Sequence, residues 1–375
     1  MDPRADDVVF MRRALELAAR AEGLTSPNPV VGAVVVKNGS VIAEGYHRAA
    51  GSLHAEVEAL TAAGARARDA TLYVTLEPCT HQGRTGPCVP VLLASGIGRV
   101  VIATADPNPA VNGRGIAVLV EAGVEVGVGI LEGEARQLNR AFFTYMNAGR
   151  PFVTLKAGLS LDGKIAAWDR ASRWITGDPA RQEAHRLRSR ADAIAVGIGT
   201  ILADDPLLTV RLPETWPREP LRIVVDSRAR TPLTARMLTA GRPERTLIAV
   251  TPLAPPDRIR MLQARGVNVL VLPARDGRVD LPALLKVLAE REVTSLLLEG
   301  GGELNAGFLE AGLVDRVALF VAPLLVGGTK APSLVGGAGR SLKEAFRLSG
   351  VSVRRVGDDL LIEADVEQGD VYRDR

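Results

Sequence analysis

His54, Glu56 and the two cysteines of this chain form its most reactive group of side chains. The 375 residues include only two cysteines, Cys79 and Cys88, and four histidines. One imidazole and two thiolates can hold zinc and leave its fourth position to water, whose pKa then falls to about 7. Such water becomes hydroxide at neutral pH. The residue types therefore predict one zinc ion per chain, held by His54, Cys79 and Cys88, at a hydrolytic site.

The spacing of these residues is close to a known deaminase pattern. Zinc enzymes that remove an amino group from a nucleobase carry H-x-E followed by P-C-x-x-C, and their glutamate shuttles protons without binding the metal. His54-Ala55-Glu56 and Pro78-Cys79 match, but eight residues separate Cys79 from Cys88. That insertion, Thr80-His81-Gln82-Gly83-Arg84-Thr85-Gly86-Pro87, is polar and rich in glycine. It can loop out while both sulfurs return to one metal, with Glu56 as the proton shuttle.

Two other interpretations of the cysteines remain open at this point. A structural zinc site normally has four protein ligands, and His81 is the obvious additional donor, which spacing alone does not exclude. The two cysteines could also be ordinary buried thiols. Glu56 favours the catalytic interpretation, because a structural site has no use for a proton shuttle beside a ligand.

The composition favours a two-domain enzyme of the cytoplasm. Single cores seldom exceed about 250 to 300 residues, so this length predicts two domains. A net charge of +3 and an aromatic content of 4% argue against nucleic acid as a partner. The polar N-terminal residues do not resemble a signal peptide, and no apolar run reaches the roughly 20 residues of a membrane span. Cysteines committed to a metal suit a reducing compartment.

The first half of the sequence shows alternating strands and helices. A helix is expected from residue 10 to Gly23, a hairpin over residues 30–36 and 41–45 around Asn38-Gly39, and a helix over 54–63. A strand over 70–76 leads to Cys79, and a helix over 87–95 carries Cys88 in its first turn. The remaining elements are a strand over 99–103, a helix through 119, a strand over 124–130 and a helix over 132–148. This alternation predicts a three-layer α/β/α domain, in which helices cover both faces of the sheet.

Gly149-Arg150-Pro151 marks the expected domain boundary, since a C-cap glycine followed by proline ends a helix. Strands are then expected over residues 152–157, 193–196, 221–225, 246–250, 267–272, 295–299 and 316–325, mostly separated by helices. We therefore predict a first domain over residues 1–149, a second α/β domain over 150–367 and a loose tail over 368–375.

Two glycine turns in the second half could bind anions. Glu299-Gly300-Gly301-Gly302 follows a strand and opens a helix, where free amides suit a cofactor phosphate, although a tight turn without a ligand is an alternative. Gly197-Ile198-Gly199 begins like a dinucleotide fingerprint, but Leu202 replaces its third glycine, so a Rossmann site is not supported. Arg188 and Arg211 could bind phosphate or simply be solvated.

With these motifs, the chain resembles the bifunctional deaminase/reductase family of riboflavin biosynthesis, from about residue 10 to about residue 364. Gly86 departs from the proline that this family suggests before Pro87-Cys88. The segments that carry the resemblance are Pro27-Asn28-Pro29-Val30-Val31-Gly32, Gly45-Tyr46-His47, Gly51-Ser52-Leu53-His54-Ala55-Glu56, Glu77-Pro78-Cys79-Thr80-His81-Gln82-Gly83-Arg84-Thr85, Asp106-Pro107-Asn108-Pro109, Lys156-Ala157-Gly158-Leu159-Ser160-Leu161-Asp162-Gly163-Lys164, Ser172-Arg173-Trp174-Ile175-Thr176, Gly199-Thr200-Ile201-Leu202-Ala203-Asp204-Asp205-Pro206-Leu207-Leu208-Thr209-Val210-Arg211 and Glu299-Gly300-Gly301.

The resemblance implies a cytidine-deaminase-like domain followed by a dihydrofolate-reductase-like domain that uses NADPH. We also expect a homo-oligomer. The resemblance implies His54, Cys79 and Cys88 as zinc ligands, and Glu56, Lys156 and Glu299 as catalytic residues. The implied NADPH contacts are Gly158, Trp174, Thr200, Asp204, Ser227, Gly301, Gly302, Glu303, Leu304, Asn305, Ala306 and Gly307. The implied substrate contacts are Asn28, Ser172, Arg188, Leu208, Arg211 and Glu299.

The expected function is hydrolytic deamination of a diaminopyrimidinone ribosylamine phosphate by zinc hydroxide, followed by NADPH reduction of its ribosyl chain to ribityl. One rival is another base deaminase with an unrelated accessory domain, which would not oxidise NADPH. A second is a non-catalytic zinc module that binds nucleotides, which would release no ammonia.

Overall fold

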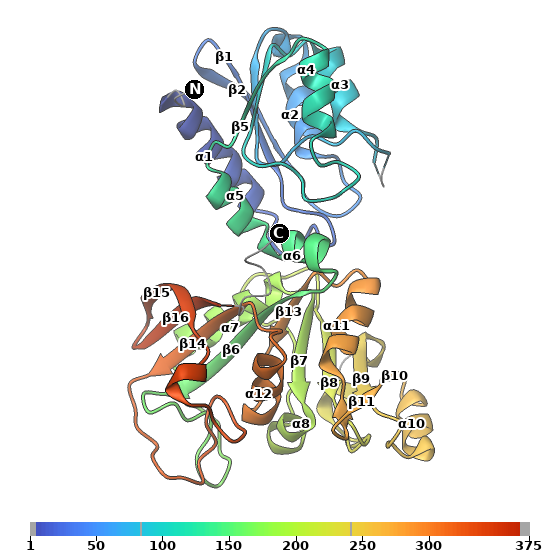
Figure 1. Ribbon diagram of the computed structural model, residues 1–375, viewed down its shortest axis with the longest axis vertical. Helices are drawn as coiled ribbons and strands as arrows, with labels where there is room; N and C mark the ends of the chain where they lie inside the picture. The colour runs from blue at the N-terminus through green and yellow to red at the C-terminus, as the bar shows by residue number, and fades with distance from the viewer. Residues whose placement is uncertain (1–4, 83–84, 241, 368–375) are drawn as a thin grey trace. The chain divides into compact units, whose positions relative to one another are not determined.

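The computed structural model describes residues 5–82, 85–240 and 242–367, so the tail expected over 368–375 lies outside the described residues. The chain divides into two compact units, Met1–Arg150 and Pro151–Arg375. Each unit has its own sheet, and each is described separately (Figure 1).

The first unit contains a five-stranded sheet in the order β2-β1-β3-β4-β5. Its strands are β1 (Gly32–Lys37), β2 (Ser40–Tyr46), β3 (Thr71–Val74), β4 (Arg99–Ile102) and β5 (Glu125–Val128). Strands β1 and β2 form the expected hairpin, and Asn38 and Gly39 have φ values of 52° and 74°. Positive φ at both turn residues matches the twist of the flanking strands. Strands β3, β4 and β5 run parallel.

Helices cover both faces of this sheet, because its strands bury alternate side chains on opposite sides (Figure 1). Val35 and Leu72 face one core with α2 (Ala55–Ala63) and α3 (Cys88–Ser95), and α4 (Arg114–Glu121) packs beside α3. Val34 and Tyr73 face another core with α1 (Ala5–Ala19) and α5 (Glu132–Leu138). The expected three-layer α/β/α arrangement is confirmed.

Two helix predictions in this unit were wrong in their extent. Helix α1 ends at Ala19, and turns lead on to Gly23. The helix expected over 132–148 is two helices, α5 and α6 (Arg140–Ala148), which meet at Asn139. The buried Asn139 amide accepts a hydrogen bond from the Val30 N–H and donates one to the Val30 carbonyl oxygen, each at 2.9 Å. These bonds tie the break to the start of the hairpin.

The second unit is built on a nine-stranded sheet in the order β10-β9-β8-β7-β13-β6-β14-β16-β15. Its strands are β6 (Phe152–Ser160), β7 (Ala193–Gly197), β8 (Leu221–Val225), β9 (Thr246–Val250), β10 (Asn268–Val271), β13 (Ser295–Leu298), β14 (Arg316–Ala322), β15 (Leu348–Val356) and β16 (Asp359–Val366). All neighbours from β10 to β14 are parallel, whereas β16 and β15 are antiparallel. The sequence analysis did not predict β15 and β16. A two-stranded hairpin, β11 (Ala274–Arg275) and β12 (Arg278–Val279), stands apart from this sheet.

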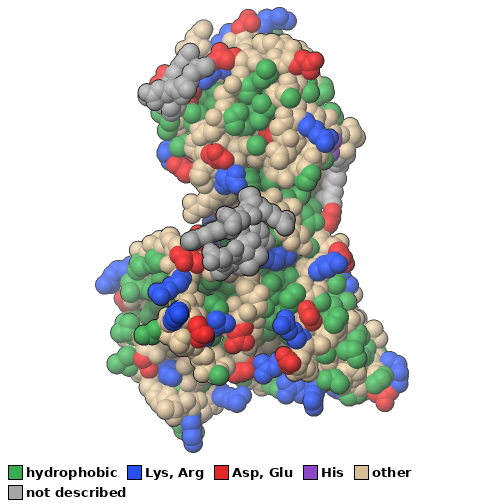
Figure 2. All heavy atoms as spheres, in the orientation of Figure 1, with side chains coloured by type: hydrophobic (Ala, Val, Ile, Leu, Met, Phe, Trp, Pro, Cys, Tyr) green, Lys and Arg blue, Asp and Glu red, His purple; other side chains and the backbone are tan. Residues whose placement is uncertain are grey.

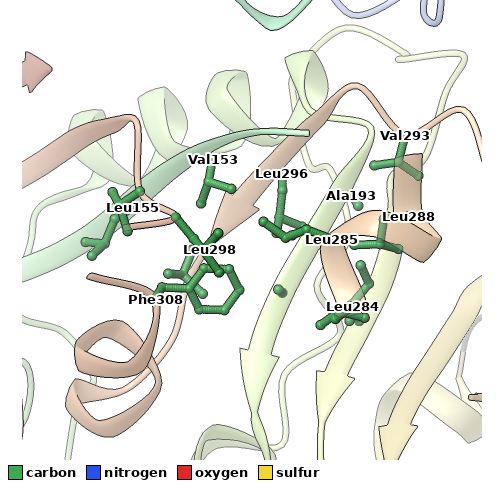
Figure 3. Close-up of a cluster of buried hydrophobic side chains, with 14 of the residues drawn as sticks. Val153, Leu155, Ala193, Leu284, Leu285, Leu288, Val293, Leu296, Leu298 and Phe308 are labelled. Atoms are coloured by element: carbon green, nitrogen blue, oxygen red, sulfur yellow. The ribbon is translucent and has the colours of Figure 1, made fainter. Parts of the chain in front are cut away.

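Both faces of this sheet are also buried. On one face, side chains of β6 and β13 pack against α11 (Leu281–Glu290) and α12 (Gly302–Glu310), with Phe308 fully buried (Figure 3). On the other, Ile194 and Val224 pack with α8 (Ile198–Asp204), α9 (Arg236–Thr239) and α10 (Pro256–Gln263). Helix α7 (Asp178–Arg190) packs on Ala318 and Phe320 of β14. The predicted α/β class is therefore correct for both units.

The remaining elements are three short 3-10 helices, η1 (Gly64–Ala67), η2 (Pro243–Arg245) and η3 (Leu342–Glu344). Basic and acidic side chains are interspersed over the face shown in Figure 2. Among the helices of the described residues, none has the length and apolar character needed to cross a bilayer.

Candidate active sites

The three expected zinc ligands meet at one point of the first unit. His54, Cys79 and Cys88 have donor atoms within 4.8 Å of one another, and no other such group occurs among the residues that the structure describes. His54 is the N-cap of α2, Cys79 follows β3, and Cys88 is the first residue of α3. Two helix N-termini thus face the thiols, and their dipoles favour thiolates.

The insertion returns to the cluster as the sequence predicted. The Cys88 N–H donates to the Cys79 carbonyl oxygen at 3.1 Å and lies 3.4 Å from the Cys79 sulfur. Backbone pairing across the two cysteines therefore closes the loop of residues 80–87 at its base. Gly83 and Arg84 lie outside the described residues.

The donor set fits a tetrahedral zinc ion. His54 Nδ1 lies 3.1 Å from the Cys88 sulfur and 3.6 Å from the Cys79 sulfur, and ligands of tetrahedral zinc lie about 3.5 Å apart. His54 Nε2 lies 2.8 Å from the Thr85 hydroxyl. A histidine that donates one ring N–H to a neighbour presents its other nitrogen to a metal, so Nδ1 is the nitrogen that would bind zinc.

Glu56 is buried and His81 is exposed outside the cluster, as a catalytic zinc site requires. Glu56 lies in the first turn of α2, two residues after His54, with 4% of its surface exposed. Burial raises its pKa above the usual range, which suits a group that takes up and releases a proton. His81 is exposed and is not in the cluster. The structural-site alternative therefore lacks its fourth ligand among the described residues.

Asn28 is connected to this site through a histidine to which the sequence analysis gave no role. His47 lies 3.0 Å from the Leu53 carbonyl oxygen through Nδ1 and 3.1 Å from the Asn28 amide through Nε2. Its ring is edge-on to His54, with centroids 5.5 Å apart. Burial lowers the pKa of His47, so a neutral ring donates to Leu53 and accepts from Asn28. A lone histidine after a strand carries no sequence signal for this role.

Glu77 is a second residue that the sequence analysis left without a role. Its carboxylate is 3% exposed and accepts four backbone N–H bonds. The donors are Asp106 at 3.2 Å, Gly113 at 2.9 Å, Gly115 at 2.9 Å and Ile116 at 3.2 Å. Glu77 therefore ties the Cys79 segment to the start of α4.

The second unit contains a cavity of about 1560 Å³. All of the reductase residues expected from the resemblance line it except Asn305 and Ala306, which are buried. Those that line it are Lys156, Gly158, Ser172, Trp174, Arg188, Thr200, Asp204, Leu208, Arg211, Ser227, Glu299, Gly301, Gly302, Glu303, Leu304 and Gly307. Residues far apart in the sequence, from Lys156 to Gly307, thus share one cavity.

A buried ion triad lies in this cavity. Arg188 contacts Glu299 with two bonds, Nε to Oε1 at 2.6 Å and Nη2 to Oε2 at 2.8 Å. Lys156 Nζ lies 3.5 Å from the same carboxylate. Burial opposes the ionisation of Glu299, but the charges of Arg188 and Lys156 outweigh it and hold the pKa of Glu299 below its usual range. Glu299 is therefore an anion that fixes two cations.

The glycine turn after β13 fits the phosphate of a bound cofactor. Helix α12 begins after Gly301, and no side chain caps its amides. A Cβ atom at Gly301 would meet nothing within 4 Å, whereas one at Gly300 would lie 2.8 Å from the Asn305 Oδ1 atom. Open space beside Gly301 and uncapped amides at the start of a helix suit an anion, whereas Gly300 and Gly302 are required by close packing.

Two family models match the chain. The cytidine and deoxycytidylate deaminase zinc-binding region matches residues 4–104, and the RibD C-terminal domain matches residues 151–362. The riboflavin biosynthesis protein RibD of Actinobacillus pleuropneumoniae is 45% identical over 358 residues, which are 95% of this chain and 94% of that protein. RibD of Bacillus amyloliquefaciens is 43% identical over 373 residues, 98% of this chain and 99% of that protein.

Solved structures show the same relationship. RibD of Acinetobacter baumannii has a TM-score of 0.88 at 38% identity and covers 97% of this chain and 99% of its own. A diaminohydroxyphosphoribosylaminopyrimidine deaminase/5-amino-6-(5-phosphoribosylamino)uracil reductase from Thermotoga maritima has a TM-score of 0.83 at 36% identity and covers 96% and 99%. This chain belongs to the RibD family of riboflavin biosynthesis and is a bifunctional deaminase and reductase that uses zinc and NADPH on a phosphorylated pyrimidine.

Proposed function

We propose that residues 1–149 catalyse the deamination and residues 150–367 the reduction. The observation that carries the first assignment is the convergence of His54 Nδ1 and the two sulfurs within 4.8 Å, beside a buried Glu56. We assign these three atoms as the zinc ligands. Zinc bound there supplies a Lewis acid that lowers the pKa of a bound water to about 7.

In the deaminase site, Glu56 moves the protons. Its carboxylate takes a proton from the attacking water, passes it to the ring nitrogen and then delivers a proton to the departing amine. Burial raises the pKa of Glu56, which favours a carboxyl group that acts as both base and acid. Asn28, held by His47 at 3.1 Å, orients the pyrimidine.

In the reductase site, the triad of Lys156, Glu299 and Arg188 prepares the sugar carbonyl for reduction. NADPH, when bound, supplies the hydride that reaches the sugar C1 carbon. Glu299 holds the Lys156 side chain in place at 3.5 Å, and the ammonium group polarises the carbonyl oxygen. Arg188 holds the carboxylate from its other side with two bonds.

Arg211 is the better candidate of the two arginines for the substrate phosphate. Its backbone N–H is bonded to His185, and none of the ion pairs among the described residues involves its guanidinium. Partial burial, followed by the positive charges of Arg188 and Arg236, lowers the pKa of Arg211. An anion would relieve that repulsion. Arg188, in contrast, is already neutralised by Glu299.

The contacts with NADPH are assigned from the residues that line the cavity. We assign the phosphates of NADPH to the amides after Gly301, and its ribose 2′-phosphate to the Ser227-Arg228 turn, because both segments line the cavity. Asn305 and Ala306 are buried, so they support this turn from behind.

A single incubation tests the proposal. The full chain is mixed with the diaminopyrimidine ribosylamine phosphate with and without NADPH, and ammonia and NADPH oxidation are followed together. Ammonia should appear in both mixtures, and NADPH should be consumed only after deamination. If ammonia were released without NADPH oxidation, the result would favour a deaminase with an unrelated second unit. If neither reaction occurred, the result would favour a binding module.

We also propose a homo-oligomer in the cytoplasm. The edge strand β15 exposes every residue except Val356, including Val351 at 59% and Val353 at 58%, and such an edge is prone to pair with another chain. Light scattering on the purified protein measures the state directly. Two free thiols in one metal cluster suit a reducing compartment.

A further inference from the structure

His185 lies in the reductase cavity, and no role has been assigned to it above. It is on α7, three residues before Arg188, and lines the same cavity. Side chains three apart lie on one face of a helix. Helix α7 therefore presents both His185 and Arg188 to the substrate cavity.

These two side chains hold one irregular segment. Residues 205–220, between α8 and β8, form neither helix nor strand. The Arg211 N–H donates to His185 Nδ1 at 3.2 Å, and Arg188 Nη1 donates to the Thr209 carbonyl oxygen at 3.1 Å. Helix α7 therefore holds this segment by hydrogen bonds to Thr209 and Arg211. Of these two bonds, the one to His185 fixes the backbone position of Arg211 itself.

The environment of His185 keeps its ring neutral. Burial, followed by the positive charges of Arg188 and Arg211, lowers the pKa of His185 to about 4, with Lys156 adding to this effect and Glu299 opposing it. A neutral ring has one nitrogen that accepts and one that donates. Because Nδ1 accepts from Arg211, Nε2 carries the hydrogen. A protonated ring would have no acceptor for the Arg211 N–H.

We propose that His185 is a positioning residue for substrate recognition, which fixes Arg211 through an Nδ1 acceptor so that its guanidinium meets the substrate phosphate. This inference rests on the proposed reductase function and on Arg211 as the phosphate ligand. It predicts that His185 affects how tightly the phosphorylated substrate binds, and not the hydride step.

The test compares substitutions that keep or remove the acceptor. The substrates are the deaminated intermediate and its dephosphorylated counterpart, each reduced with NADPH by the full chain. His185→Leu should raise KM for the phosphorylated substrate about tenfold, the value of one hydrogen bond, and leave kcat within about twofold. KM for the dephosphorylated substrate should not change. His185→Asn places an amide oxygen near the Nδ1 position and should restore the parental KM.

Matched variants separate this role from a general loss of structure. His185→Gln places its oxygen near Nε2 instead of Nδ1 and should remain impaired. Arg186→Gln alters the exposed side of the same helix and should match the parent. NADPH binding, measured by fluorescence titration, should be equal in all variants.

Four results would overturn the inference. These are equal losses on both substrates, no rescue by His185→Asn, full activity of His185→Leu, and an NMR titration of the His185 ring with a midpoint near 6.5. If His185→Leu does not fold, the Asn and Gln variants decide, because the inference requires them to differ. A parent enzyme that reduces neither substrate would instead refute the proposed function.

Discussion

Arg188 of α7 and Glu299 after β13 are joined by two short bonds, of 2.6 and 2.8 Å, although 111 residues separate them in the sequence. Both side chains are buried, with 13% and 10% of their surfaces exposed. The pair fixes the Lys156 ammonium on one side and the Thr209 backbone on the other. Arg188 therefore positions other residues of the site, whereas Arg211 is the arginine that would bind an anion.

The two arginines should therefore respond differently to removal. Arg211→Ala should weaken binding of the phosphorylated intermediate by roughly 1.5 to 3 kcal/mol, the value of a charge-assisted bond, and leave its dephosphorylated counterpart unaffected. Arg188→Ala should impair both substrates and lower kcat, because it frees Glu299 and Lys156. Steady-state kinetics with both substrates measure this difference. Equal, phosphate-dependent losses in the two variants would mean that Arg188 also contacts the phosphate.

The Glu299 carboxylate should stabilise the second unit at neutral pH. Removing one partner of a buried ion pair costs roughly 3 to 5 kcal/mol, so Glu299→Gln should destabilise by about that amount. Urea unfolding followed by tryptophan fluorescence reports on this unit alone, because Trp168, Trp174 and Trp216 all follow Arg150.

The difference between parent and Glu299→Gln should also depend on pH. The pKa of Glu299 is lower in the folded chain than its unfolded value of about 4.3, so the unfolded chain takes up the proton first as pH falls. The stabilisation is present above about pH 4.3 and is lost as pH falls toward the folded pKa. A difference that stayed constant between pH 7 and pH 3 would show that Glu299 is not held as an anion.

Metal analysis should find one zinc ion per chain. Cys88→Ser should lose the zinc, because it removes one of three protein ligands. His81→Ala is the matched control and should retain it, since His81 is exposed and outside the cluster. Loss of zinc from His81→Ala would indicate a closed structural site and contradict the hydrolytic mechanism.

NADPH should be preferred over NADH, and Arg228→Ala should reduce the preference. Ser227 is held in place by its hydroxyl, which accepts the Val279 N–H at 3.1 Å, and Arg228 beside it is exposed in the cavity. Loss of a guanidinium–phosphate bond should lower kcat/KM for NADPH by about tenfold or more and leave that for NADH unchanged. Equal efficiencies of the two cofactors in the parent would refute this assignment.

The sequence predicted the zinc cluster well because its ligands occur at element ends that a local pattern reveals. His54 begins α2, Cys88 begins α3 and Cys79 follows β3. The alternation of strands and helices likewise predicted both α/β units. Neither inference required knowledge of contacts between distant residues.

Features that depend on distant contacts were not predictable in this way. The break at Asn139 depends on hydrogen bonds to Val30, 109 residues away. Arg188 has the same local pattern as a solvated helix residue, and only the fold brings Glu299 to it. Strands β15 and β16 form an antiparallel edge with most of β15 exposed, so the buried apolar run that marked the other strands is absent.

The central claim is that two independent catalytic sites share this chain, and Glu56→Gln tests it most directly. The amide has nearly the shape of the carboxyl group but cannot carry the proton, so the variant should retain zinc and fold while releasing no ammonia. Supplied with the deaminated intermediate, it should oxidise NADPH at the parental rate. Lys156→Ala should show the reverse, releasing ammonia and accumulating that intermediate. If folded, zinc-containing Glu56→Gln also failed to reduce the supplied intermediate, the division into two catalytic units would be contradicted.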